Sequence, residues 1–359
     1  MPVPQRDLEL TRKRLIDWLS TRLEGASDLR VSELSGPGAT GFSSDTLMFD
    51  LAWKQGAQER REELVIRLEP SGFRLFPTYD LGQQFRVLQG LQGTDIPVPR
   101  VYLQEEDASV LGTPFFIMAK VDGHVPADSP SYHVDGWVTE LEPDERAAVW
   151  WNGLEVLASI HKLDWRALGF DFLDDPSGET TPLGRQLDFY RGYFEWAAQG
   201  KSYPTIEAGL EWLQKNRPPE PQPMAFCWGD SRLGNMIFRD KRCVAVLDWE
   251  MMTLGNPDQD IAWWLFFDRW HCEPAEVERL PGFPSREETV ERYQEWSGHE
   301  VQHLEYYEAF GAMRFSVIWL RVVQLLEELG LLPEEADLDV NNGTTRILAD
   351  LLDLPPPGE

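Results

Sequence analysis

Two neighbouring segments decide the fold of this chain: Cys227-Trp-Gly-Asp-Ser-Arg-Leu-Gly-Asn-Met-Ile-Phe238 and Val244-Ala-Val-Leu-Asp-Trp249. They set three oxygen-bearing side chains in order, namely Asp230, Asn235 and Asp248. Gly229 permits a tight approach of the backbone just before Asp230. Asp248 ends an apolar run with the composition of a strand. A carboxylate directly after a buried strand needs a partner, and a metal ion is the natural one.

The interval between Asp230 and Asn235 matches the Asp-x-x-x-x-Asn spacing of the protein-kinase catalytic loop. Phosphoryl transfer uses one carboxylate to orient or deprotonate the attacking hydroxyl group. An amide oxygen and a second carboxylate then hold the magnesium ions that neutralise the triphosphate. We therefore predict that Asp230 is the catalytic base and that Asn235 and Asp248 bind Mg2+. A plain turn residue is the alternative for Asp230 and for Asn235.

The residues around this set resemble one family. The segments Gly229-Asp-Ser-Arg-Leu-Gly-Asn235 and Leu247-Asp-Trp-Glu-Met-Met-Thr-Leu-Gly-Asn-Pro-Asp-Gln-Asp-Ile-Ala-Trp263 are similar to the aminoglycoside phosphotransferase family of kinase-like enzymes. The similarity is strongest to the branch that is fused or adjacent to acyl-CoA dehydrogenases, and it covers roughly residues 25–330. The resemblance implies a protein-kinase-like, two-lobe α+β fold. It also implies ATP and Mg2+ as cofactors, and O-phosphorylation of a small-molecule hydroxyl group.

The same resemblance assigns supporting roles to Arg232 and Asp260. Asp260 is expected to brace the catalytic loop through hydrogen bonds, while Asp258 could be the N-cap of the following helix. Trp228 departs from the family, since relatives have His-Gly-Asp where this chain has Trp-Gly-Asp. An indole offers only one hydrogen-bond donor. Asn256 stands where many relatives have Asp.

Nucleotide-binding residues are expected in the first third of the chain. Arg67 occupies the place of the kinase strand lysine, and a guanidinium can grip phosphate oxygens with two hydrogen bonds. Ser43 and Ser44 lie in a small-residue loop that could cover the phosphates, although an ordinary hairpin turn is an equal alternative. Main-chain groups near Ala119 to Val121 are expected to contact adenine.

Arg67 lies on an otherwise apolar strand, so it calls for an acidic or polar partner. In kinases this partner is a helix Glu, and the matching residue here is Gln84. Asp80 lies one helical turn earlier on the same face. We therefore expect Asp80, Gln84 or both to hold Arg67.

The order of the elements fits two lobes. We expect an N-lobe at residues 1–121 and a helical C-lobe at 122–359. The N-lobe contains a helix at 7–23, strands at 47–53 and 64–68, a helix at 79–91, and strands at 98–103 and 115–121. The C-lobe contains helices at 143–163, 204–216, 257–270, 285–297 and 301–329, with a catalytic hairpin at 224–249.

Composition narrows the partners. The net charge is −28 with no basic stripe, which argues against nucleic acid. Either general solubility or attraction of cationic substrates explains this acidity.

No uncharged apolar run of about 18 residues exists, so we expect no membrane span. The three cysteines, which form no CxxC pair, fit a reducing cytoplasm. Cys227 and Cys243 are expected to be buried and inert.

The sequence does not identify the molecule that accepts the phosphate. Aminoglycosides are the namesake substrates, whereas the dehydrogenase-linked branch suggests hydroxylated acyl thioesters or similar metabolites. His161 is expected to be a packed or capping residue, and some helical tryptophans could line an apolar acceptor pocket. Trp228 and Gln84 also allow a third reading, a catalytically silent nucleotide-binding module.

Overall fold

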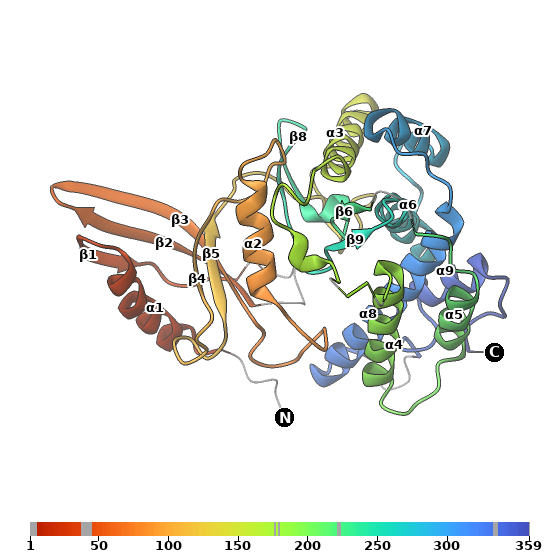
Figure 1. The fold of residues 1–359 in the computed structure, drawn as a ribbon, viewed down its shortest axis with the longest axis horizontal. Coiled ribbons are helices and arrows are strands. Elements are labelled where there is room, and N and C mark those ends of the chain that lie inside the picture. The colour runs from red at the N-terminus through yellow and green to blue at the C-terminus, as the bar shows by residue number, and fades with distance from the viewer. Residues whose placement is uncertain are drawn as a thin grey trace. The chain divides into compact units, whose positions relative to one another are not determined.

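The computed structural model describes residues 6–36, 45–175, 177–178, 180–220, 224–332 and 337–358. The chain divides into two compact units. The first consists of Met1–Gly93, Pro99–Val121 and Glu328–Leu331. The second consists of Thr94–Val98, Asp122–Glu327 and Leu332–Glu359. Figure 1 shows the elements of both.

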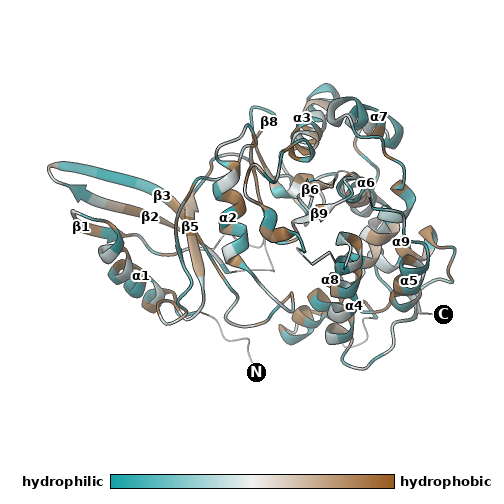
Figure 2. Cartoon of the chain, viewed as in Figure 1, coloured by the Kyte–Doolittle hydropathy of each residue, from teal (hydrophilic) through white to brown (hydrophobic). Residues whose placement is uncertain are grey.

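A five-stranded antiparallel sheet forms the centre of the first unit. Its strand order is β1-β2-β3-β5-β4 (Figure 1). The strands are β1 (Ala26–Val31), β2 (Asp45–Gln55), β3 (Gln58–Leu68), β4 (Val101–Glu105) and β5 (Phe115–Ala119). Gly56 has a φ of 63° in the turn between β2 and β3, which pair along their whole length. Figure 2 shows hydrophilic colour along the outer part of β3, where residues 58–63 are exposed.

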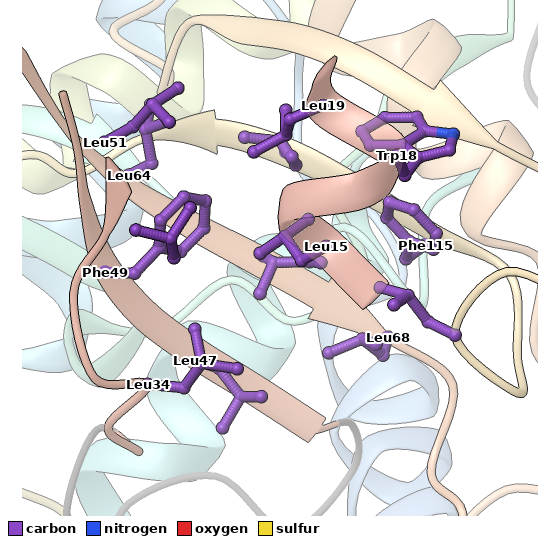
Figure 3. Packing of buried hydrophobic residues seen from close by; sticks show 14 residues of the cluster. Leu15, Trp18, Leu19, Leu34, Leu47, Phe49, Leu51, Leu64, Leu68 and Phe115 are labelled. Carbon is purple, nitrogen blue, oxygen red and sulfur yellow. The ribbon is translucent and has the colours of Figure 1, made fainter. Parts of the chain in front are cut away.

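The core of the first unit lies between α1 (Leu8–Arg22) and the sheet. Leu15, Trp18 and Leu19 of α1 pack with Phe49 and other apolar residues of the sheet (Figure 3). Because these three residues recur at helical spacing, they form one apolar stripe. Leu8, at the start of α1, is 40% exposed. The second helix, α2 (Leu81–Leu91), contacts β4 and β5.

The second unit is mainly helical. Its helices are α3 (Pro143–His161), α4 (Pro182–Ala198), α5 (Pro204–Lys215), α6 (Asp258–Cys272), α7 (Arg286–Ser297), α8 (Leu304–Glu328) and α9 (Gly343–Leu351). Short 3-10 turns, named η, lie at η1 (Asp171–Leu173), η2 (Leu233–Asn235) and η3 (Glu273–Ala275). Two small antiparallel ladders carry the motif segments. They pair β6 (Ala225–Cys227) with β9 (Thr253–Gly255) and β7 (Met236–Arg239) with β8 (Arg242–Val246).

The predicted hairpin at 224–249 was therefore wrong in one respect. Only β7 and β8 form a hairpin, whereas β6 pairs with β9, which follows the second motif segment. The turn after β6 and the turn after β8 therefore belong to two different ladders, and the β7–β8 hairpin lies in the sequence between β6 and β9. The predicted elements did not include β1, α4 or α9. For α4 a usable signal existed, because Thr181 caps the helix and Pro182 is its first residue.

Helix α8 passes through the core of the second unit. By length and composition it is long and apolar enough to cross a membrane, although it contains Arg314 and Arg321 and is therefore not an uncharged run. However, 72% of its most apolar 18-residue window is buried in the protein. Its start lies three residues later than predicted, because Gln302 N–H and His303 N–H donate to the carboxylate of Asp258 at 3.1 and 2.9 Å. Asp258 is the first residue of α6 and Pro257 is its N-cap, so the predicted N-cap role of Asp258 was wrong.

Candidate active site

Asp230 lies on a tight turn directly after β6. The turn depends on Gly229, which has a φ of 90°. A Cβ atom at this position would lie 1.9 Å from the Met251 carbonyl oxygen, so any side chain would push the segment after β8 away. Arg314 of α8 donates from Nη2 to the Gly229 carbonyl at 2.9 Å. Backbone shape and a buried cation therefore fix the turn together.

Three side chains contact the carboxylate of Asp230. Oδ1 accepts hydrogen bonds from Trp263 Nε1 at 2.8 Å and from Arg232 Nε at 3.0 Å. Oδ2 accepts one from Asn235 Nδ2 at 2.6 Å. Burial raises the pKa of Asp230 above its ordinary value, and the positive charge of Arg232 opposes this rise. A carboxylate with a raised pKa is a stronger proton acceptor than an exposed one.

A main-chain hydrogen bond links Asn235 to the residue before Asp248. Leu247 N–H donates to the Asn235 carbonyl at 2.8 Å, which ties the end of η2 to the residue before Asp248. The amide nitrogen of Asn235 donates both to the Asp230 carbonyl at 3.1 Å and to its side chain, so Oδ1 is the atom that can bind a metal ion. Asp248 has a φ of 54°, in the left-handed region. An amide oxygen and a carboxylate form a hard donor set, which fits Mg2+.

Trp228 joins the two motif segments. Its indole Nε1 donates to the carbonyl oxygens of Leu247 at 2.8 Å and Asp248 at 3.1 Å. The side chain is completely buried, and its ring lies 5.9 Å from that of Trp249. One donor shared between two acceptors thus holds the turn of Asp230 against the segment that carries Asp248.

Asp260 lies beneath the catalytic turn. Its carboxylate accepts hydrogen bonds from the main-chain N–H groups of Trp228 at 2.7 Å and Gly229 at 2.9 Å, and its carbonyl accepts one from Ser231 Oγ at 2.7 Å. The Nε2 atom of His161 is 3.0 Å from the same carboxylate. Asp260 thus makes hydrogen bonds of the kind that the family resemblance implies.

The buried set of His161, Cys227 and Asp260 has the spacing of metal ligands, since their ligand atoms lie within 4.8 Å of one another. Its chemistry argues for a structural role. The oxygens of Asp260 already accept main-chain hydrogen bonds, and burial raises the pKa of the Cys227 thiol well above its ordinary value. His161 Nδ1 lies 2.6 Å from the hydroxyl oxygen of Tyr293. His161 therefore links α3 and α7 to the support of the catalytic turn.

Sequence reasoning missed Asp128, which lies 104 residues before Arg232 and contacts it. Arg232 Nη1 donates a short hydrogen bond to Asp128 Oδ2, while Nε of the same guanidinium bonds Asp230. His271 Nε2 lies 3.3 Å from Asp128 Oδ1. No local motif marks Asp128, because its partners are distant in the sequence.

The expected nucleotide residues lie in the first unit. Arg67 is on β3, opposite Thr46 of β2 and Phe116 of β5. Gln84 is buried on α2. Asp80 caps that helix, since its side chain accepts a hydrogen bond from Gln83 N–H at 2.8 Å. The role of Asp80 or Gln84 as a partner of Arg67 stays a prediction.

The other two nucleotide segments differ in how far they can be placed. Ala119 ends β5, and its N–H donates to the Arg100 carbonyl at 2.7 Å. Val121 is the last residue of its stretch of the first unit. Ser43 and Ser44 lie outside the described residues.

Comparison with known proteins finds a matching family and several relatives. The sequence profile of the phosphotransferase enzyme family, APH, matches residues 49–299, which contain Asp230, Asn235 and Asp248. Human acyl-CoA dehydrogenase family member 11 is 30% identical over 243 residues, which are 66% of this chain and 30% of that protein. Mouse acyl-CoA dehydrogenase family member 10 is 33% identical over 265 residues, which are 73% of this chain and 22% of that protein. The chain thus matches less than a third of either relative.

Solved structures show the same fold. A protein from Ralstonia eutropha, provisionally assigned as an aminoglycoside phosphotransferase, superposes with a TM-score of 0.68 and 25% identity, over 94% of this chain and 95% of the other. A choline kinase from Streptococcus pneumoniae superposes with a TM-score of 0.55 and 15% identity, over 96% and 99%. The predicted kinase-like α+β fold is confirmed.

Proposed function

Because the chain belongs to the phosphotransferase enzyme family, we propose that it transfers the γ-phosphoryl group of ATP to a hydroxyl group of a small molecule. The observation that carries this proposal is the assembly around Asp230. A buried carboxylate with a raised pKa contacts the amide of Asn235, and the backbone of Asn235 is bonded to the residue before Asp248.

Asp230 accepts the proton of the acceptor hydroxyl group as its oxygen attacks the γ-phosphorus. Its Oδ1 atom accepts hydrogen bonds from Trp263 and Arg232. Oδ2, which accepts one hydrogen bond from Asn235 Nδ2, is therefore the atom that would accept the proton. Asn235 and Asp248 would hold magnesium, which neutralises the charge of the triphosphate. Arg67, main-chain groups at Ala119 to Val121, and the loop of Ser43 and Ser44 would contact the nucleotide.

Two classes of acceptor compete, and an aromatic wall favours the less polar one. We define the aromatic wall as Trp270 of α6 with Phe315 and Trp319 of α8, all partly exposed. It begins beside the catalytic base, because the ring of Trp263, which bonds Asp230, lies 6.1 Å from that of Phe315. Phe315 and Trp319 rings are 5.2 and 5.8 Å from Trp270.

Aromatic rings bind apolar or flat groups, whereas a polyamine needs carboxylates or carbonyl oxygens. These features favour a hydroxylated acyl thioester or similar metabolite over an aminoglycoside. The names of the two mammalian relatives, which refer to acyl-CoA dehydrogenases, agree with this choice.

A silent nucleotide-binding module is the second candidate function. Trp228 and Gln84, which replace the usual His and Glu, motivate it. The hydrogen bonds of Trp228 to the carbonyls of Leu247 and Asp248 weaken the case, because they support the loop in another way. A reducing, cytoplasmic setting would suit either function, since all three cysteines are buried, free thiols.

The test is a screen for ATP-dependent mass gain of one phosphate. The purified protein is incubated with ATP and MgCl2 and with two acceptor panels, aminoglycosides and hydroxyacyl thioesters. We expect phosphorylation of the second panel and a loss of at least about 100-fold in kcat for Asp230→Asn, because the base is removed. Chelation of Mg2+ by EDTA should abolish the reaction.

Glu145→Gln is the matched control, because it removes a carboxylate of the same unit that pairs with Lys241 on the surface. Its activity should equal that of the wild type. Nucleotide binding without phosphate transfer to either panel or to water would contradict the proposal and favour the silent module.

A further inference from the structure

Arg232 lies between two carboxylates, and this position restricts how it touches the catalytic base. Its Nη1 atom donates to Asp128 Oδ2 and its Nε atom to Asp230 Oδ1. The guanidinium also packs over the ring of Phe267, with its central carbon 5.0 Å from the ring centroid. Only 17% of the Arg232 side chain is exposed, so few alternative conformations are open to it.

The electrostatics of the pair are strong. Burial would raise the pKa of Asp128, but the charge of Arg232 and the hydrogen bond from His271 outweigh it and hold the pKa well below its usual range. Burial would lower the pKa of Arg232, and Asp128 and Asp230 raise it instead. Arg232 is therefore a permanent cation shared by two anions.

Gly234 makes room for this ion pair. A Cβ atom at residue 234 would lie 2.3 Å from Asp128 Oδ1 and 2.5 Å from Arg232 Nη1. Its φ is not in the left-handed region, so backbone conformation does not require glycine here. The glycine at this position of the motif is explained by the space that Asp128 and Arg232 occupy.

Without Asp128, the guanidinium would be free to form the two parallel hydrogen bonds that arginine prefers with a carboxylate. Such a pair would occupy both oxygens of Asp230, which lies only two residues away. The base would then have no oxygen for the acceptor proton. Asp128 engages Nη1, and this contact anchors the guanidinium in the orientation in which Nε bonds Asp230 Oδ1.

We propose that Asp128 is a positioning residue for the phosphotransferase, which holds Arg232 so that it contacts Oδ1 of Asp230 and leaves Oδ2 to the acceptor. This inference rests on the proposed function for its catalytic consequence. Its structural content, the placement of Arg232 by Asp128, can be tested without any activity.

The kinetic test uses Mg-ATP hydrolysis, with water as the acceptor, so that no acceptor needs to be known. Asp128→Asn should lower kcat by about 10- to 100-fold, because a small misplacement at a catalytic group has effects of this size. The KM for Mg-ATP should stay within about twofold of the wild-type value, since Asp128 is not expected to touch the nucleotide.

A double-mutant cycle separates positioning from general damage. If Asp128 acts through Arg232, then Asp128→Asn combined with Arg232→Gln should have the same kcat as Arg232→Gln alone. Multiplied losses in the double variant, or a kcat within twofold of wild type for Asp128→Asn, would overturn the inference. Glu145→Gln again controls for loss of an ion pair, because its partner Lys241 lies on the surface of the same unit.

The structural test is a crystal structure of the Asp128→Asn variant. We expect the contact between Arg232 Nε and Asp230 Oδ1 to be replaced, either by two hydrogen bonds to Asp230 or by departure of the guanidinium. An unchanged Arg232 would refute the inference. Should this variant not fold, Gly234→Ala takes its place, because its methyl group would displace the same pair.

The two proposals fail separately. Absence of Mg-dependent ATP turnover in the wild type contradicts the proposed function, while the position of Arg232 in the variant still decides the role of Asp128.

Discussion

The indole N–H of Trp228 joins the turn that carries Asp230 to the segment that carries Asp248. Histidine has two ring nitrogens for such contacts and tryptophan has one. The loss is offset in two ways. The indole donor serves two carbonyl oxygens, and Asp260 holds the Trp228 main-chain N–H from below. Trp228 therefore replaces the expected His with a different set of hydrogen bonds, and the turn that carries Asp230 is still held by Asp260 and by the carbonyls of Leu247 and Asp248.

The substitution Trp228→Phe keeps an aromatic ring at this position and removes the indole donor. Two buried carbonyl oxygens would lose a partner, so we expect the free energy of unfolding to fall by about 1–3 kcal/mol. The kcat should fall together with it, because Asp248 is no longer held against the catalytic turn. Urea unfolding and Mg-ATP hydrolysis measure the two effects.

Trp249→Phe serves as the control for ring size, since its Nε1 donates locally to the Val246 carbonyl and not across the two segments. A normal kcat in Trp228→Phe would show that the indole donor has no part in placing Asp248.

At the scale of elements, a carboxylate in the first turn of α6 sets the start of α8. Asp258 is fully buried and accepts hydrogen bonds from two main-chain N–H groups that precede α8, and its Oδ1 lies 2.6 Å from His299 Nε2. Helix N-termini leave main-chain donors unsatisfied, and a side chain from another element supplies the acceptor here. Since α8 also carries Arg314, which bonds the Gly229 carbonyl, its register bears on the catalytic turn.

Asp258→Ala should therefore destabilise the protein by about 1–3 kcal/mol, because buried donors lose their acceptor. Hydrogen exchange should rise first at the amides of residues 302 and 303. Thermal unfolding gives the global effect, and exchange measured by mass spectrometry gives its location.

Glu305→Gln provides a matched comparison, since Glu305 is an exposed acidic residue in the first turn of α8. It should change stability by only a few tenths of a kcal/mol, about what a helix dipole interaction contributes. Equal effects of the two substitutions would mean that Asp258 acts by charge alone.

Site residues that lie close together in the sequence could be predicted, whereas contacts between distant segments could not. Asp230, Asn235, Asp248 and Asp260 fall within one continuous stretch, so their spacing carried the information. Asp128 and His161 lie 104 and 99 residues from their partners, and a single sequence holds no record of such contacts. Pairing of β6 with β9 was missed for a similar reason, because a three-residue strand gives no periodic pattern.

On the scale of the whole molecule, the net charge of −28 opposes compactness. Like charges repel across each folded unit, and dissolved salt screens this repulsion over a Debye length of about 10 Å at 0.1 M. Several ion pairs that accompany the charge are exposed on both sides, such as Arg30–Glu59 and Lys54–Asp28, and exposed pairs contribute little stability that salt could remove.

We therefore expect the Tm to rise between about 10 mM and 300 mM NaCl, because screening of net repulsion outweighs the weakening of surface ion pairs. Differential scanning calorimetry in the presence of EDTA checks this without bound divalent ions. Tetramethylammonium chloride at equal ionic strength should act alike, whereas an effect of NaCl alone would indicate specific ion binding. A Tm that falls with salt would contradict the argument.

The space above Gly234 has an evolutionary consequence. Residues 128, 232 and 234 share one small volume, since a side chain at 234 would overlap both members of the ion pair. A larger residue at 234 therefore requires the side chains of Asp128 and Arg232 to move. A lineage that loses the aspartate or the arginine can accept a larger residue at the glycine position, whereas a lineage that keeps both is expected to retain glycine there.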